Sequence, residues 1–146
     1  MIFKAKKSLG QNFLVDQNIL MLIANSTKIE KSDEIVEIGP GTGNLTEFLL
    51  KKNPKKMYLI EKDENLANLL KNKFSKSLNV INEDVLKFSK KNLLSNESII
   101  FGNLPYNISS QILVKFIINK NKFKFKKLIF MFQKELADRI LANVNS

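Results

Sequence analysis

The sequence contains no cysteine and no histidine, and Arg139 is its only arginine. Without cysteine the chain forms no disulfide, has no thiolate nucleophile and offers no thiolate ligand to a metal. Without histidine, a serine–histidine–aspartate triad, a histidine general base and the common kinds of zinc site are excluded as well. We therefore expect no resident metal, and any reaction must proceed without these two side chains.

Long apolar runs are also missing. No run approaches the roughly 18 residues that a membrane span requires. Residues 1–7 carry lysines without the apolar stretch and cleavage site of a secretory signal. The remaining composition, 146 residues with 44% hydrophobic and 26% charged side chains, is typical of one globular domain. We expect a cytoplasmic protein with no membrane partner.

Negative charge is scarce relative to positive charge. Lysine and arginine number 24 against 14 acidic residues, which gives a formal net charge of +10. Such a surface suits a polyanion such as RNA or DNA. A biased genome can produce the same lysine-rich composition, so the charge alone does not decide the partner.

Short apolar runs alternate along the chain with amphipathic, helix-like segments. This order predicts a doubly wound α/β fold around a parallel sheet, as in Rossmann-like proteins. The predicted strands are Glu34–Ile38, Lys56–Ile60, Leu78–Asn82, Ser98–Phe101 and Lys127–Phe132. The predicted helices are Gln17–Ala24, Leu45–Lys52, Glu64–Phe74, Ser109–Ile118 and Lys134–Asn143, with Asp16 and Asp63 as N-caps of the first and third.

A glycine turn follows the first predicted strand, and acidic residues follow the next two. Residues 39–43 read Gly-Pro-Gly-Thr-Gly, which allows a sharp turn and a ligand close to the backbone. Glu61 could accept hydrogen bonds from a ribose diol, and Asp84 ends the third strand. Glu37 before the turn would repel a pyrophosphate and suit a cationic ligand, which favours S-adenosylmethionine over a dinucleotide.

Each of these features also has a purely structural interpretation. The glycine loop could be only a tight turn, Glu61 a solvated charge beside Asp63, and Asp84 the cap of a turn over residues 85–88. Their occurrence in order at successive strand ends favours a nucleoside site.

The fourth predicted strand runs into Asn103, Leu104, Pro105 and Tyr106. The Asn103 side-chain oxygen and the Leu104 carbonyl could each accept one N–H of an exocyclic amine, which would aim its lone pair at a methyl donor. Pro105 stiffens the turn and Tyr106 offers a face on which an extruded base can stack. No strong base is needed, because the nitrogen becomes acidic once it is methylated. The alternative is a plain loop with a half-buried tyrosine.

Four segments together resemble the ribosomal RNA adenine dimethyltransferases. They are residues 10–14 (GQNFL), 37–43 (EIGPGTG), 102–109 (GNLPYNIS) and 133–135 (QKE). The resemblance implies S-adenosylmethionine-dependent N6-dimethylation of two adjacent adenosines near the 3′ end of small-subunit rRNA, with that RNA or the pre-ribosomal small subunit as partner. The related erythromycin-resistance methylases act on large-subunit rRNA, and GNLPYNIS fits the small-subunit branch better.

The resemblance also implies roles for individual residues. The cofactor-binding residues would be Asn12, Leu14, Gly39, Gly41, Glu61, Asp84 and Asn103. The target base would meet Asn103, Leu104, Pro105 and Tyr106, and we expect RNA phosphates at Lys4, Lys6 and Lys7, with Tyr106 contacting the RNA base. The lysine-rich stretch Lys115–Lys127, which interleaves lysines with Phe123 and Phe125, could contact RNA; we favour its interpretation as a solvated approach to the fifth strand.

Family members continue with an edge hairpin and a small helical domain. Residues 1–146 are therefore expected to form an incomplete catalytic domain that lacks the helical domain. The apolar run in Lys127–Phe132 predicts burial on both faces, with a bare outer edge that favours self-association. Two alternatives stay open: an RNA-binding or ribosome-assembly factor without turnover, and a methyltransferase for another substrate, such as DNA adenine or a protein glutamine amide.

Overall fold

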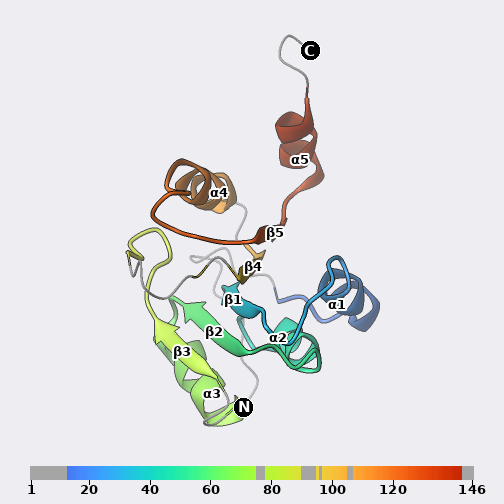
Figure 1. The fold of residues 1–146 in the computed structure, drawn as a ribbon, viewed down its shortest axis with the longest axis vertical. Helices are drawn as coiled ribbons and strands as arrows, with labels where there is room; N and C mark the ends of the chain where they lie inside the picture. The colour runs from blue at the N-terminus through green and yellow to red at the C-terminus, as the bar shows by residue number, and fades with distance from the viewer. Residues whose placement is uncertain (1–12, 75–77, 90–94, 96, 105–106, 143–146) are drawn as a thin grey trace.

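The computed structural model describes residues 13–74, 78–89, 95, 97–104 and 107–142 as strands alternating with helices (Figure 1). The elements are α1 (Gln17–Ala24), β1 (Glu34–Ile38), α2 (Asn44–Leu50), β2 (Lys56–Glu61), α3 (Glu64–Phe74), β3 (Asn79–Asn82), β4 (Ser98–Asn103), α4 (Ser109–Ile118), β5 (Lys127–Met131) and α5 (Lys134–Leu141).

The strands form one parallel sheet in the order β3-β2-β1-β4-β5. The chain builds outward from β1 to β3 and then crosses back to place β4 on the other side of β1. Ile38 at the end of β1 pairs with Ile60 on one side and Gly102 on the other, so the carboxyl ends of the central strands lie level. The predicted doubly wound fold is confirmed, and its switch point, where ligands bind in such sheets, lies between β1 and β4.

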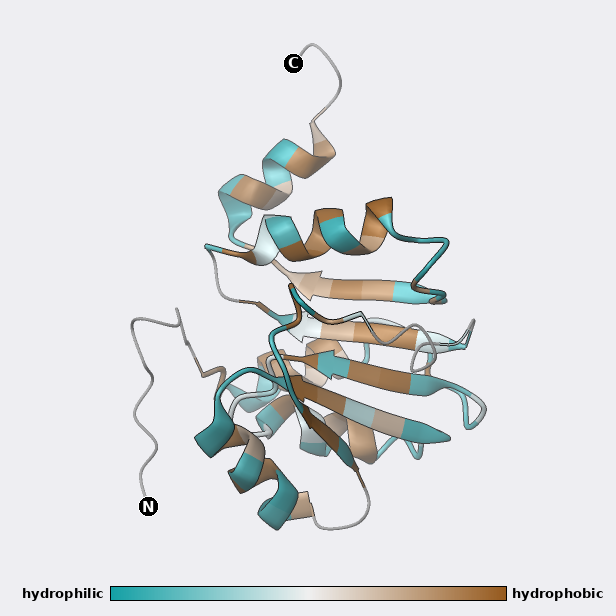
Figure 2. Ribbon diagram, turned by 90° about the vertical axis from the view of Figure 1, so that its left-hand side faces the viewer, coloured by the Kyte–Doolittle hydropathy of each residue, from teal (hydrophilic) through white to brown (hydrophobic). Residues whose placement is uncertain are grey.

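Two hydrophobic clusters cover the two faces of the sheet. Ile35, Leu59 and Phe101 point toward the cluster that includes buried residues of α1, α2 and α3. Their strand neighbours Val36, Ile60 and Ile100 point toward the cluster that includes α4. Successive strand side chains alternate between faces, and because both faces are covered the central strands carry apolar side chains on both of them. Figure 2 shows the hydrophobic residues concentrated in the strands.

Local capping sets several helix boundaries. Asp16 Oδ1 accepts hydrogen bonds from the Asn18 and Ile19 N–H groups at 2.8 and 3.2 Å, which confirms it as the N-cap of α1. Asp63 Oδ1 does the same for Asn65 and Leu66 at 2.9 and 3.2 Å, at the start of α3. These bonds satisfy N–H groups that have no partner within the helix, and both helices begin where the sequence predicts.

Strand β5 differs from its prediction. It ends at Met131 rather than Phe132, and none of Leu128, Ile129, Phe130 and Met131 is fully buried. The expected burial on both faces is therefore wrong. The reason is the position of β5 at the edge of the sheet, where it has a neighbour on one side only among the described residues. Helix α5 beyond it has no buried residue and lies at one end of the molecule (Figure 1).

Candidate nucleoside site at the carboxyl edge of the sheet

The glycine turn after β1 adopts a backbone that other residues rarely take. Gly39, Gly41 and Gly43 have φ of 66, 60 and 82°. A Cβ added to Gly43 would lie 2.7 Å from the Phe74 ring, so a side chain there is excluded by space as well as by φ. The Gly39 N–H donates to Ile60 O at 2.9 Å and ties the turn to the end of β2. This places the backbone of the turn beside Glu61.

Glu61 is a buried carboxylate at the end of β2, 6% exposed. Its Oε2 accepts the Gly41 N–H at 3.2 Å and its Oε1 accepts the Asp63 N–H at 2.9 Å. Burial raises its pKa, and these hydrogen bonds oppose that shift. The interpretation of Glu61 as a solvated charge is therefore wrong. Each carboxylate oxygen keeps a second lone pair that can accept a hydrogen bond from a ligand.

Asp84 follows β3 and is fixed from two sides. Its Oδ1 accepts the Leu86 N–H at 2.9 Å, and its Oδ2 lies 2.9 Å from Lys62 Nζ. The Lys62 ammonium holds the pKa of Asp84 below its usual value. Asp84 therefore caps the turn that follows it, as the structural interpretation predicts. The same hydrogen bond holds the ionised carboxylate in place at the strand end, so the capping role does not exclude a role in ligand binding.

Asn103 ends β4 opposite the glycine turn. A Cβ built on Gly39 lies 3.8 Å from the Asn103 backbone oxygen, which brings the two predicted site residues together. Asn103 is half-buried, and no hydrogen bond engages its side chain among the described residues. Leu104 is 3% exposed and packs into the α4-side cluster, so its side chain anchors the segment while its carbonyl remains the predicted acceptor.

Glu37 is buried, whereas the sequence argument against a pyrophosphate treated it as a fixed negative charge. It is 2% exposed, and its Oε2 accepts the Thr46 hydroxyl at 2.7 Å. Burial raises its pKa to about 7; the Thr46 hydrogen bond opposes this, and the Glu61 charge adds to it. Near neutral pH the carboxyl is therefore divided between its two protonation states rather than being a fixed negative charge.

Phe13 and Asn44 belong to this site although no sequence argument assigned them to it. The Phe13 ring lies 3.0 Å from the position of a Cβ on Gly41, and Asn44 Nδ2 donates to Leu14 O at 2.8 Å. With Glu37, Gly39 and Asn103 they enclose a space of about 30 Å³. A space of this size holds about one water molecule. A nucleoside would therefore lie in the open crevice outside the strand ends.

The stretch Lys115–Lys127 is less solvated than predicted. Lys115 is half-buried and donates to two main-chain carbonyls, Phe123 is 4% exposed, and Lys126 pairs at 2.8 Å with the fully buried Asp33. The prediction is wrong for Lys115 and Phe123, because Phe123 joins the α4-side cluster and Lys115 lies over its ring. The other lysines of the stretch, Lys120, Lys122, Lys124, Lys126 and Lys127, are exposed as predicted.

Several predicted residues lie outside the described part of the chain. They are Lys4, Lys6, Lys7, Asn12, Pro105 and Tyr106. The described residues hold no cluster of three or more acidic side chains arranged to bind a metal ion, and none of their helices is long and apolar enough to span a bilayer.

The hydrogen-bond acceptors at this edge fit S-adenosylmethionine. Glu61 and Asp84 are fixed acceptors at neighbouring strand ends, as a ribose diol and an adenine amine require. The glycine turn presents backbone without side chains between them and Asn103.

Comparison with known proteins gives one family over nearly the whole chain. The model of the ribosomal RNA adenine dimethylase family matches residues 2–146. Ribosomal RNA small subunit methyltransferase A of Pelagibacter ubique is 52% identical over all of this chain and 56% of its own length. The enzyme of the same name from Sulfurihydrogenibium is 41% identical over 95% of this chain and 55% of its own. The chain thus spans about half the length of the curated relatives it matches.

Solved structures give the same result. A dimethyladenosine transferase from Plasmodium falciparum is 35% identical with a TM-score of 0.78, over 92% of this chain and 48% of that one. The 23S rRNA methyltransferase ErmE is 26% identical with a TM-score of 0.74, over 87% of this chain and 50% of that one.

Proposed function

Because the chain belongs to the ribosomal RNA adenine dimethylase family, we propose that it carries the cofactor site and catalytic turn of an S-adenosylmethionine-dependent RNA methyltransferase. The reaction is N6-dimethylation of adjacent adenosines near the 3′ end of small-subunit rRNA, during ribosome maturation in the cytoplasm. The observation that supports it best is that Glu61 and Asn103 lie against the glycine turn at the switch point of the sheet, with Asp84 just past the end of the neighbouring strand.

In this proposal each strand end has one task. Glu61 accepts hydrogen bonds from the ribose diol, and Asp84 accepts one from the adenine amine. The bound cofactor supplies a methyl group on a sulfonium. Asn103 and the Leu104 carbonyl accept hydrogen bonds from the two N–H groups of the substrate amine, which draws its lone pair out of conjugation with the base and aims it at the methyl carbon. Pro105 and Tyr106 complete this turn, with Tyr106 under the target base.

The substrate partner is the small-subunit RNA or its precursor particle. Relatives over 40% identical are named as ribosomal RNA small subunit methyltransferases, and the net charge of +10 suits a polyanion. Within the proposal, Lys4, Lys6 and Lys7 contact phosphates near the active site, and Asn12 and Leu14 close over the cofactor. Residues 1–146 act as the first part of a longer catalytic domain.

Methyl transfer to unmethylated small subunits, with and without Asn103→Ala, tests the proposal. Asn103→Ala should abolish transfer while cofactor affinity is partly kept, because its oxygen orients the amine mainly on the way to the transition state. Asn121→Ala, an exposed amide in the turn after α4, is the control and should keep activity. RNA binding without transfer by the unchanged chain would favour the assembly-factor alternative instead. Transfer to DNA adenine or a glutamine amide, but not to the RNA, would point to a different substrate.

A further inference from the structure

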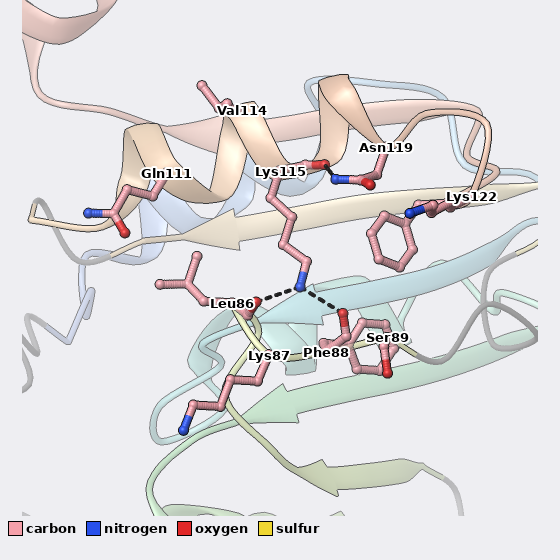
Figure 3. A pocket seen from close by; sticks show the side chains of 10 residues that line it. Leu86, Lys87, Phe88, Ser89, Gln111, Val114, Lys115, Asn119 and Lys122 are labelled. Atoms are coloured by element: carbon pink, nitrogen blue, oxygen red, sulfur yellow. Dashed lines mark hydrogen bonds between the residues drawn. The ribbon is translucent and has the colours of Figure 1, made fainter.

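Lys115 reaches from α4 to the main chain of the Asp84 turn. Its Nζ donates hydrogen bonds to Leu86 O and Phe88 O, both at 2.7 Å, and lies 5.6 Å from the centroid of the Phe123 ring (Figure 3). The side chain crosses a cavity of about 610 Å³ between α4 and the turn. Burial lowers the pKa of Lys115, and the charges of Asp84 and Glu83 oppose that shift.

The turn that Lys115 holds is the one that carries Asp84. The Lys87 and Phe88 N–H groups donate to Asp84 O at 2.9 and 3.0 Å, and the Leu86 N–H donates to Asp84 Oδ1 at 2.9 Å. These bonds use the N–H groups of the turn and leave its carbonyls to find other donors. Lys115 supplies the donor for two of them. Lys115 of α4 thus stabilises the turn conformation that orients the Asp84 carboxylate, through hydrogen bonds to the turn's carbonyls.

Helix α4 is itself connected to the catalytic turn. It begins at Ser109, directly after the segment that contains Asn103 and Leu104, and its buried residues Ile112 and Phe116 share a cluster with Leu104. Lys115 therefore joins the helix that follows Asn103 and Leu104 to the turn that carries Asp84. A charged donor to a carbonyl is a stronger bond than a neutral one, so the connection is substantial.

We propose that Lys115 is a positioning residue: its two hydrogen bonds hold the Asp84 turn so that the Asp84 carboxylate selects a purine with a 6-amino group over one with a 6-oxo group. The inference rests on the proposed function, because it takes Asp84 to face the cofactor base. An ionised carboxylate accepts a hydrogen bond from the amine and repels the oxo group, so the selection depends on its placement. Sites built to bind one N–H reject analogues that lack it far more strongly than apolar pockets do.

The test is the ratio of affinities for S-adenosylhomocysteine and S-inosylhomocysteine, measured by calorimetry on the chain. Lys115→Met keeps the length of the side chain and removes the donor. It should lower the ratio by about tenfold, the usual effect of losing one hydrogen bond to a charged group. Lys115→Arg, which can donate to both carbonyls, should restore most of the ratio. Lys122→Met is the control, because Lys122 lines the same cavity and makes no side-chain hydrogen bond among the described residues.

The ratio separates positioning from general stability. A merely structural Lys115 would lower the melting temperature and both affinities together, with the ratio unchanged, and that result would overturn the inference. If Lys115→Met does not fold, Lys115→Gln replaces it, since its shorter amide cannot span both carbonyls; an unaltered ratio there would equally overturn it. Failure of the unchanged chain to bind S-adenosylhomocysteine would contradict the proposed cofactor itself. Binding without preference for the amino purine would overturn only the role assigned to Asp84 and Lys115.

Discussion

Three carboxylates at the edge of the sheet show how far surroundings change one chemical group. Asp84 faces a lysine, and its pKa is lowered by the Lys62 ammonium. Glu61 is buried, and main-chain N–H groups only partly offset the rise that burial causes in its pKa. Glu37 has one hydroxyl as its partner, and burial raises its pKa to about 7. The first is a permanent anion, whereas the third changes charge near neutrality.

The raised pKa of Glu37 predicts that stability falls as pH rises. Between its ordinary value of 4.5 and about 7, the folded chain binds more protons than the unfolded chain. The contribution of Glu37 to the free energy of unfolding is therefore fully present below pH 4.5. It is lost progressively as the pH rises to about 7, and the total loss is at most roughly 3 kcal/mol. Glu37→Gln keeps an acceptor for the Thr46 hydroxyl and has no charge. Urea unfolding from pH 4.5 to 8 should show a flatter profile for this variant.

Glu47→Gln is the control for that profile, because Glu47 is an exposed residue of the same helix that carries Thr46. This variant should show the same fall in the free energy of unfolding between pH 4.5 and 7 as the unchanged chain. Equal slopes for the unchanged chain and Glu37→Gln would contradict the assignment of the proton to Glu37.

At the scale of elements, an ion pair between a buried carboxylate and a partly exposed lysine links the start of β5 to the loop before β1. Asp33 is fully buried, and it accepts hydrogen bonds at 2.8 Å from both the Glu30 N–H and Lys126 Nζ. Burial alone would raise the pKa of Asp33, but the Glu30 and Lys126 bonds hold it below its usual value. The two residues are far apart in the sequence, so the pair fixes β5 against the core of the sheet.

Lys126→Met should destabilise the chain because it leaves the Asp33 carboxylate buried without its cation. Removing one partner of a fully buried pair costs roughly 3–5 kcal/mol. The Lys126 side chain is 34% exposed, so water can partly replace it, and we expect about 1–3 kcal/mol in the free energy of unfolding. Lys124→Met, two residues earlier and exposed, should change it by less than about 0.5 kcal/mol. Equal urea midpoints for the two variants would contradict the role of the pair.

The elements themselves could largely be predicted from the sequence, and the reason is local. Helices α1, α3 and α4 begin and end at the predicted residues, since aspartate caps and apolar periodicity are visible in the chain. The strand ends that carry Glu61, Asp84 and Asn103 were predictable in the same way. The role of Lys115 was not, because its partners are main-chain carbonyls of a distant turn, which no side-chain pattern encodes. The packing of Phe13 on Gly41 was hidden for the same reason.

On the scale of the whole molecule, the two edges of the sheet differ. Strand β5 is longer than β3 and carries apolar side chains that are only half-buried. Its outer edge has no strand partner among the described residues. Open edges of this kind can pair with another chain. An association of the chain with itself would therefore involve β5 before any other part of the sheet.

We predict that the apparent mass rises with concentration in light scattering between about 10 and 300 μM, through pairing at β5. The control is Leu22→Ser, which removes a 71% exposed apolar side chain from α1 and should leave the association as it is. A constant monomer mass over this range would contradict the prediction. Association abolished by Leu22→Ser would assign it to the α1 surface instead.

The central claim is that the carboxyl edge of the sheet binds S-adenosylmethionine with Glu61 on the ribose, and a calorimetric titration tests it most directly. The unchanged chain should bind one equivalent. Glu61→Ala should weaken binding by about 1–3 kcal/mol, because the diol loses a charged acceptor, in a variant shown by thermal unfolding to be folded. Glu64→Ala, an exposed acid of the first turn of α3, should bind as the unchanged chain does. No binding by the unchanged chain, or equal affinity in Glu61→Ala, would contradict the account.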